Sequence, residues 1–213
     1  MNYTQTFGST NTLIGVSGII GVGKSTLTKS LGEIGNYNVL HEPVETNEYL
    51  SKFYNDMSRY SFPMQIYLLN HRFKQHQQMV WSDESTVQDR TIYEDVIFAK
   101  MLMESGHMEE LDFKTYVGLF QNMCNFLHRP DVIVYLDVDP KIALERINQR
   151  SRGCESGIPL EYLESLRDGY EEWLKDIEGR IPILRLYWNT YQDPKVVHAK
   201  IQKLINGKKG LIV

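Results

Sequence analysis

The chain has 213 residues and a formal net charge of −4, with 42% hydrophobic and 23% charged residues. This length suits one α/β domain with a full core, and the composition is typical of a globular protein. A DNA or RNA polymer is not expected as a partner, because proteins that bind one usually carry a basic excess. No apolar run approaches the length of a membrane span. The two cysteines, Cys124 and Cys154, form no CxxC pair, so we expect reduced thiols and a cytoplasmic location.

Short apolar runs alternate with amphipathic segments along the chain. Strands are predicted at 13–17, 38–41, 86–88, 132–137 and 183–187. Helices are predicted at 24–31, at 47–80 with a break into two at Pro63, and at 91–104, 112–127, 140–150, 159–177 and 194–205. This order predicts an α/β fold with a five-stranded parallel sheet flanked by helices. We expect a single domain over 1–213, with 1–11 as a disordered tail.

The first predicted strand runs into a glycine-rich loop that opens the first predicted helix. Residues 18–25 read GIIGVGKS and match the pattern GxxxxGK[ST], which in this context indicates a phosphate loop (P-loop) for a nucleoside triphosphate. Backbone N–H groups of such a loop wrap the phosphates, the lysine reaches the β- and γ-phosphates, and the serine hydroxyl binds Mg²⁺. The residues expected to hold ATP here are Gly18, Gly21, Val22, Gly23, Lys24, Ser25 and Thr26.

Charged side chains follow the next two predicted strands, where a parallel sheet places its site. Glu42 could accept a proton from an attacking hydroxyl. Arg90 could neutralise phosphate oxygens, and Asp89 could hold Mg²⁺ or orient a hydroxyl. Taken alone, Glu42 could equally be a solvated turn carboxylate, and Asp89 with Arg90 a surface ion pair.

Three arginines lie close together near the end of a predicted helix. Arg146 and Arg150 are four residues apart and share a helix face, and Arg152 follows beside Gly153. Such a group suits a lid over a triphosphate, because phosphoryl transfer requires charge neutralisation around the γ-phosphate. A solvated helix face is the alternative interpretation.

Taken in order, these motifs resemble the deoxyribonucleoside kinase family, over residues 13 to about 173. The matching segments are the P-loop, Glu42-Pro43-Val44, Asp89-Arg90-Thr91-Ile92-Tyr93, Arg150-Ser151-Arg152 and 157–163. The resemblance implies a P-loop kinase fold with an arginine-rich lid. It also implies transfer of the γ-phosphate of ATP to the 5′-hydroxyl of a deoxynucleoside, with Mg²⁺ held by Ser25 and Asp89.

Further roles come from the same resemblance. Glu42 is implied as the general base, with Lys24 and Arg90 as the other catalytic groups. Tyr54 and Glu155 are implied to bind the sugar 3′-hydroxyl, Gln65 to bind the base edge and Phe98 to stack on the base. Arg72 is seven residues from Gln65 on one predicted helix face, and an Arg72–Asp95 pair would favour amino-bearing or purine bases.

The base preference and the assembly are less defined by the pattern. The segment 89–98 is most similar to deoxyadenosine kinases, so we expect deoxyadenosine first, deoxyguanosine second and deoxycytidine third. Whether Glu94 or Asp95 faces the base stays open. A thymidylate-type monophosphate kinase and a non-enzymatic relative are the alternatives to a deoxynucleoside kinase. Members of the family usually form homodimers, and helices within 61–80 and 91–104 could supply the interface.

Overall fold

A computed structural model describes residues 11–42, 47–82, 84–150 and 157–209. Five strands form one sheet: β1 (Leu13–Ser17), β2 (Asn38–Leu40), β3 (Thr86–Asp89), β4 (Val132–Asp137) and β5 (Ile183–Tyr187). They lie in the order β2-β3-β1-β4-β5, and every neighbouring pair is parallel. All five residues of the central strand β1 are buried, as expected for a strand covered on both faces. The predicted α/β fold with a five-stranded parallel sheet is confirmed.

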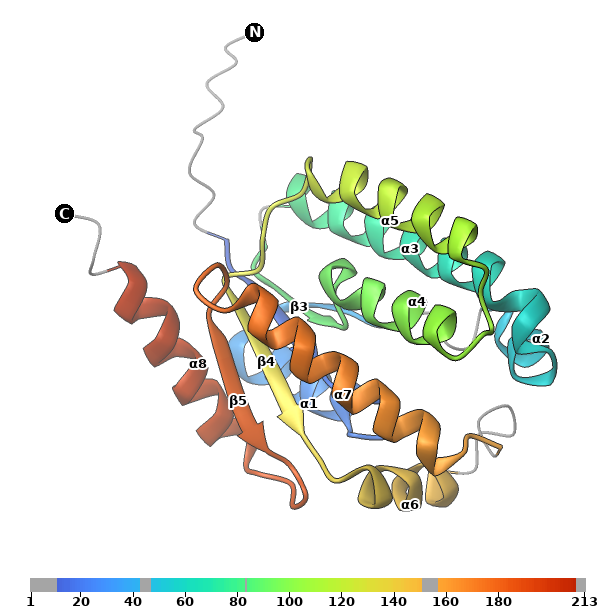
Figure 1. Cartoon of the computed structure of the whole chain (residues 1–213). Coiled ribbons are helices and arrows are strands. Elements are labelled where there is room, and N and C mark those ends of the chain that lie inside the picture. The colour runs from blue at the N-terminus through green and yellow to red at the C-terminus, as the bar shows by residue number, and fades with distance from the viewer. Residues whose placement is uncertain (1–10, 43–46, 83, 151–156, 210–213) are drawn as a thin grey trace, which may run out of the picture.

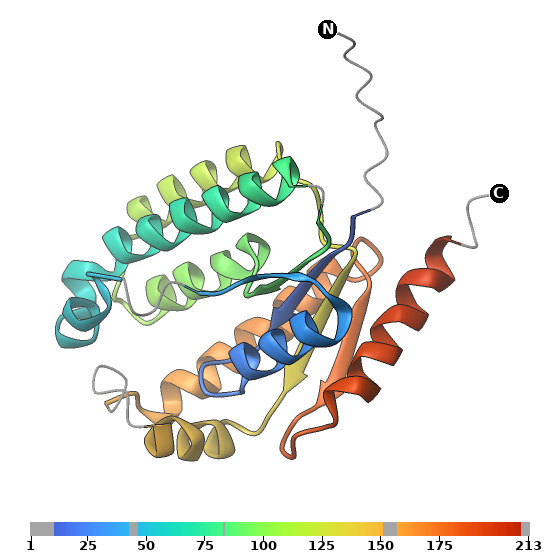
Figure 2. The ribbon, with the colours of Figure 1, turned by 180° about the vertical axis from the view of Figure 1, so that it is seen from behind.

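Helices cover both faces of this sheet (Figures 1 and 2). Helices α1 (Lys24–Gly35) and α8 (Pro194–Lys209) lie on one face, and α4 (Asp95–Glu104) and α7 (Leu160–Ile177) lie on the other. Helices α3 (Met57–Trp81) and α5 (Glu110–Cys124) pack outside α4. The remaining helices are α2 (Leu50–Asn55), the 3₁₀ turn η1 (Ile92–Glu94) and α6 (Pro140–Arg150). Within the described residues, no helix has the length and apolarity needed to cross a membrane.

The predicted helix break at Pro63 is wrong, because α3 continues through that residue. The break lies at Asp56, whose Oδ1 accepts a hydrogen bond of 3.2 Å from the backbone N–H of Arg59 and so caps the start of α3. Proline inside a helix removes the hydrogen bond to the carbonyl four residues earlier, here that of Arg59. Arg59 is exposed, so water can solvate that carbonyl in place of the missing N–H. Of the predicted tail at 1–11, only Asn11 lies within the described residues.

The carboxyl ends of three adjacent strands meet at one edge of the sheet. β1 leads into the P-loop, β2 leads toward Glu42, and β3 ends next to Arg90. In open α/β sheets, ligands bind at this edge. The fold therefore brings together the three charged segments that the sequence singled out.

Candidate active site

The P-loop adopts a backbone that only glycine accommodates well. Gly21 and Gly23 have φ values of 83° and 103°, in the left-handed region. A Cβ on Gly21 would also lie 2.5 Å from the carbonyl oxygen of Ala143. Helix α1 begins at Lys24 without an acidic residue in its first turn, so its N-terminal N–H groups present an uncompensated positive end.

Lys24 is held inside this loop. Its Nζ donates hydrogen bonds of 3.0 Å to the carbonyl oxygens of Gly18 and Ile19, and the residue is only 7% exposed. Burial lowers the pKa of Lys24 to about 8, and the charge of Arg90 adds to the fall against the opposing effect of nearby carboxylates. An anion beside Nζ would relieve both effects, so this site is suited to phosphate.

Ser25 and Asp89 form a pair of oxygen groups beside the loop. The Ser25 hydroxyl donates to Oδ2 of Asp89 at 2.5 Å. Oδ1 of Asp89 is buried and has no hydrogen-bond partner among the described residues. Mg²⁺ is usually held by one or two carboxylates together with substrate phosphates. A hydroxyl and a carboxylate with an unused oxygen therefore fit a Mg²⁺–triphosphate complex.

Glu42 lies between two buried arginines. Nη2 of Arg72 and Nη1 of Arg90 both donate to Oε1 of Glu42 at 2.7 Å. Among the hydrogen bonds of the described residues, none reaches Oε2. The Glu42 side chain is 18% exposed and lines a cavity of about 240 Å³. One carboxylate oxygen is thus fixed by the protein, and the other remains for a ligand.

The same arginines set the charge of Glu42. Burial raises the pKa of this carboxyl, but Arg90, Arg72 and Lys24 together outweigh burial and bring the pKa down to about 2. Glu42 is therefore ionised at any physiological pH. The carboxylate is therefore available to accept a proton, although the two arginines make it a weaker base than an ordinary glutamate.

Arg90 is positioned by an unusual backbone. Its N–H donates to the carbonyl of Val16 at 3.0 Å, and its φ of 66° then turns the chain out of β3. Left-handed backbone costs energy for a non-glycine residue and is concentrated at functional sites. The guanidinium also lies 4.6 Å from the centre of the Phe98 ring. Arg90 is thereby fixed between Glu42 and one wall of the cavity.

Arg72 connects Glu42 to Asp95. Its Nη1 donates to Oδ1 of Asp95 and its Nη2 to Glu42. The guanidinium therefore bridges two carboxylates and forms no bidentate pair with Asp95. Neither Arg72 nor Asp95 is among the residues that line the cavity. Within the described residues, Nε of Arg72 and Oδ2 of Asp95 are buried without a hydrogen-bond partner. The pair therefore lies behind the residues that line the cavity.

Glu94 has a different role from Asp95. Its Oε1 accepts from the backbone N–H of Thr91 at 2.8 Å, and its Oε2 accepts from the Tyr170 hydroxyl at 2.8 Å. Both oxygens are therefore engaged inside the protein. Asp95 pairs with Arg72, whereas Glu94 stabilises the turn that starts at Thr91, and neither carboxylate lines the cavity.

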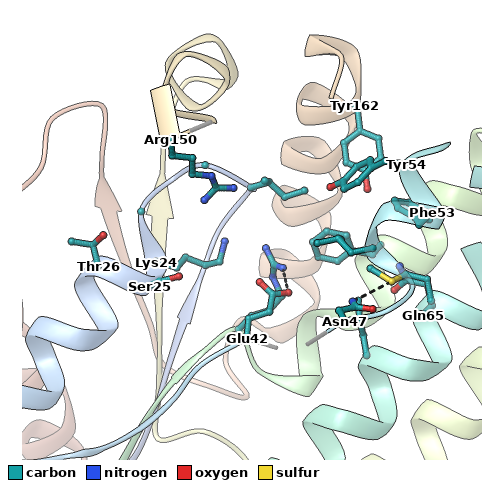
Figure 3. Close-up of a pocket in the computed structure, with 18 residues that line it drawn as sticks. Lys24, Ser25, Thr26, Glu42, Asn47, Phe53, Tyr54, Gln65, Arg150 and Tyr162 are labelled. Carbon is teal, nitrogen blue, oxygen red and sulfur yellow. Dashed lines mark hydrogen bonds and ion pairs between the residues drawn. The ribbon is translucent and has the colours of Figure 1, made fainter. Parts of the chain in front are cut away.

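The cavity extends from the P-loop to a pocket lined by aromatic and amide side chains (Figure 3). Gln65 and Tyr54 lie at this far end, and Glu42 lies between them and Lys24. Phe98 lines the same cavity. The sequence analysis gave no role to several further lining residues: Ile20, Asn47, Leu50, Phe53, Leu68 and Tyr162. Phe53 could have been suspected as a lining residue, because it precedes Tyr54 in the sequence. No pattern in the sequence pointed to Asn47.

The predicted lid arginines divide into three cases. Arg150 lines the cavity together with Ser25 and Thr26. Arg146 does not line it: its guanidinium donates to the carbonyls of Val22, Trp188 and Asn189 at 3.1, 2.9 and 2.8 Å, and lies 4.4 Å from the Tyr191 ring centre. Arg152 lies outside the described residues, as does Glu155.

Comparison with known proteins agrees with this geometry. The family model for deoxynucleoside kinase matches residues 14–209. Deoxyadenosine kinase of Dictyostelium discoideum is 50% identical over 191 residues, which are 90% of this chain and 78% of that protein. Deoxyadenosine/deoxycytidine kinase of Bacillus subtilis is 42% identical over 184 residues, covering 85% of this chain and 84% of that protein.

Solved structures are similar over nearly the whole length. Deoxyadenosine kinase from M. mycoides with bound dATP has a TM-score of 0.81 and 32% identity, covering 92% of this chain and all of that one, 100%. The same enzyme with the products dCMP and a flexible dCDP has a TM-score of 0.82 and 33% identity, covering 92% of this chain and 99% of that one. With its P-loop, its Glu42–Arg90 pair and these matches, the chain belongs to the deoxynucleoside kinase family.

Proposed function

We propose that this deoxynucleoside kinase acts chiefly on deoxyadenosine, and that Glu42 takes the proton from the 5′-hydroxyl as that oxygen attacks the γ-phosphate of ATP. The observation that carries the proposal is the arrangement around Glu42. Both arginine contacts are on Oε1, so Oε2 remains for the substrate hydroxyl. The carboxylate also lies between Lys24 at one end of the cavity and Gln65 at the other.

The other charged groups suit the charge that develops during transfer. Lys24 and Arg150 line the phosphate end of the cavity, and Arg90 lies beside Glu42. In phosphoryl transfer, catalysis rests on positioning and on neutralising the equatorial oxygens of the γ-phosphate. Ser25 and Asp89 would hold Mg²⁺, which would supply positive charge beside the phosphate oxygens. When the P–O bond to the leaving diphosphate breaks, the hydroxyl proton passes to Oε2 of Glu42.

Exchanging Glu42 for glutamine tests the proton acceptor. Glu42→Gln should lower kcat by ~10²–10⁴-fold, the usual contribution of general base catalysis. Glu48→Gln is the matched control, because Glu48 is exposed and does not line the cavity. A Glu42→Gln enzyme with near-normal kcat would remove Glu42 from the mechanism.

The base preference is supported by the polar groups at the far end of the cavity and by the relatives. Gln65 is 3% exposed, and its amide can donate and accept at once. In the family that the sequence resembles, an Arg–Asp pair beside the glutamine goes with amino-bearing or purine bases, and Arg72 and Asp95 form such a pair here. Two similar proteins, one named for deoxyadenosine and one for both deoxyadenosine and deoxycytidine, support deoxyadenosine as the preferred substrate.

A competition assay with the four deoxynucleosides tests this preference. We expect deoxyadenosine to give the highest kcat/KM, and deoxynucleoside monophosphates to give no turnover as acceptors. Thymidine as the best substrate would overturn the assignment of the base. Turnover of thymidylate would favour a monophosphate kinase.

A homodimer and a cytoplasmic location complete the proposal. Large exposed apolar side chains lie on or next to α3 and α5: Trp81 (81% exposed), Leu111 (74%) and Phe126 (85%). Helix α4, which the sequence suggested as part of the interface, is mostly buried under its neighbours. The interface therefore belongs on α3 and α5. Light scattering on the purified chain should give twice 24.8 kDa, and Trp81→Glu with Leu111→Glu should lower it.

A further inference from the structure

The strand that leads to Glu42 stops early. β2 has only three residues, lies at the edge of the sheet, and makes its last backbone pair between Leu40 and Gln88. Glu42 follows two residues later, beyond the end of that ladder. An edge strand has a neighbour on one side only, so the backbone around Glu42 needs another anchor.

Side-chain amides supply that anchor. Nε2 of Gln75, on α3, donates to the carbonyl oxygen of His41 at 2.8 Å. Oε1 of Gln75 in turn accepts from Nε2 of Gln88 at 3.3 Å. Gln88 is fully buried on β3, directly opposite Leu40. The two glutamines thus form a chain of hydrogen bonds from β3, through Gln75 on α3, to the backbone carbonyl that precedes Glu42.

We propose that Gln75, supported by Gln88, is a positioning residue that holds the backbone of Glu42 in its reactive place. This inference rests on the proposed role of Glu42 as proton acceptor. Arg72 and Gln75 are three residues apart and lie on one side of α3. Helix α3 therefore holds Glu42 at two points: Arg72 binds the carboxylate, and Gln75 binds the backbone carbonyl that precedes it.

A positioning role predicts a particular kinetic pattern. Gln75 does not line the cavity, so its loss leaves the contacts of the sugar and base in place. Misplacing a reacting group by even 1 Å can lower a rate by ~10²-fold, because reaction needs the atoms in contact. Losing one of several anchors should therefore lower kcat by about 10-fold and change KM for the deoxynucleoside by less than about 3-fold.

The experiment compares substitutions at Gln75 in two backgrounds. Gln75→Ala removes the amide, and Gln75→Glu keeps its length but replaces the donor to His41 with an acceptor. Both should show the fall in kcat with little change in KM. Gln78→Ala, an exposed residue on the same helix, is the control and should behave as the unaltered enzyme. Thermal unfolding of each variant establishes that the compared samples are folded.

The second background is Glu42→Gln. If Gln75 acts through Glu42, Gln75→Ala should cause no further loss of kcat once the carboxylate is gone. An equal additional loss in that background would show a merely structural role and overturn the inference. A Gln75→Ala enzyme with unchanged kcat, alongside a strongly impaired Glu42→Gln enzyme, would also overturn the inference. That result would leave the proposed function intact. A fully active Glu42→Gln enzyme would instead overturn the proposed function, and the inference with it.

Discussion

Arg72 connects the helix that carries Gln65 to the Glu42 carboxylate, because its Nη2 donates to Oε1 of Glu42 at 2.7 Å. Gln65 and Arg72 are two turns apart on α3, and both are buried. The same arginine also reaches Asp95 on α4. In the proposed function, base recognition by Gln65 and proton removal by Glu42 are linked through the Arg72 side chain, so a change at position 72 should alter both.

The first prediction is that Arg72→Met combined with Asp95→Ala changes both rate and selectivity. Loss of Arg72 removes one of the two arginine contacts to Glu42 Oε1, so kcat should fall for every deoxynucleoside. Loss of the Arg72–Asp95 pair removes the feature that the proposal links to amino-bearing bases, so the ratio of kcat/KM for thymidine over deoxyadenosine should rise. The double substitution avoids a buried carboxylate without a partner. Steady-state kinetics with all four deoxynucleosides measures the ratio, and an unchanged ratio would contradict the assignment.

The second prediction concerns the pH dependence of ATP use. Lys24 has a pKa of about 8, lowered by burial and by Arg90, so the free enzyme loses this positive charge as the pH rises through 8. We expect kcat/KM for ATP to fall over that range. Bound triphosphate should raise the pKa, because a nearby anion favours the ammonium, so the fall in kcat at saturating ATP should lie at higher pH.

The acid side of the same profile tests Glu42. With a pKa of about 2, Glu42 stays ionised near its ordinary value of 4.5, and no loss of activity at that pH should arise from it. Profiles of kcat and kcat/KM between pH 4 and 10 distinguish these expectations. Alkaline limbs at the same pH in both profiles would count against Lys24 as their source.

The third prediction concerns stability. Burial raises the pKa of Glu94 from 4.5 to about 7, so the folded state holds a proton that the unfolded chain releases. The contribution of Glu94 to the free energy of unfolding should therefore fall as the pH rises from 4.5 to 7. Glu94→Gln is neutral throughout. The advantage of the unaltered protein over the variant should shrink by on the order of 2 kcal/mol over that range.

Urea unfolding of both proteins at pH 5, 6 and 7 measures this difference. Other buried groups titrate in both proteins alike, so the comparison isolates position 94. Asp95→Asn is a second test, because it removes the neighbouring carboxyl, whose pKa burial raises to about 6. A difference that does not vary with pH would contradict the prediction.

The sheet and the phosphate end of the site follow from the sequence because they depend on local patterns. The apolar run at 13–17, the glycines of the P-loop and Lys24 lie within one short stretch, and their geometry is dictated by backbone conformation. Residues at adjacent strand ends converge for the same reason, which is why Glu42 and Arg90 could be expected to meet.

Other features depend on contacts between segments distant in the chain. Pro63 was expected to break a helix, but the cap at Asp56 and packing on neighbouring helices outweigh the one lost hydrogen bond. Arg146 was expected at the triphosphate, yet the loop after β5 offers it two carbonyls and an aromatic ring, and the P-loop offers it the carbonyl of Val22. Gln75 looks like any polar helix residue until β2 and β3 are placed beside it.

The last prediction concerns the 3′-hydroxyl of the sugar. Tyr54 lines the cavity near Gln65, where a phenol can hydrogen-bond that hydroxyl (Figure 3). Tyr54 is only partly buried, so loss of this hydrogen bond should cost about 1 kcal/mol, and 2′,3′-dideoxyadenosine should have a kcat/KM lower than deoxyadenosine by ~5-fold. Tyr54→Phe removes the polar atom and should narrow that ratio by lowering the use of deoxyadenosine alone. Tyr60→Phe serves as the control, since Tyr60 lies on α3 outside the cavity lining and should keep the full ratio. Equal use of the two substrates by the unaltered enzyme, or an unchanged ratio in Tyr54→Phe, would remove Tyr54 from sugar recognition.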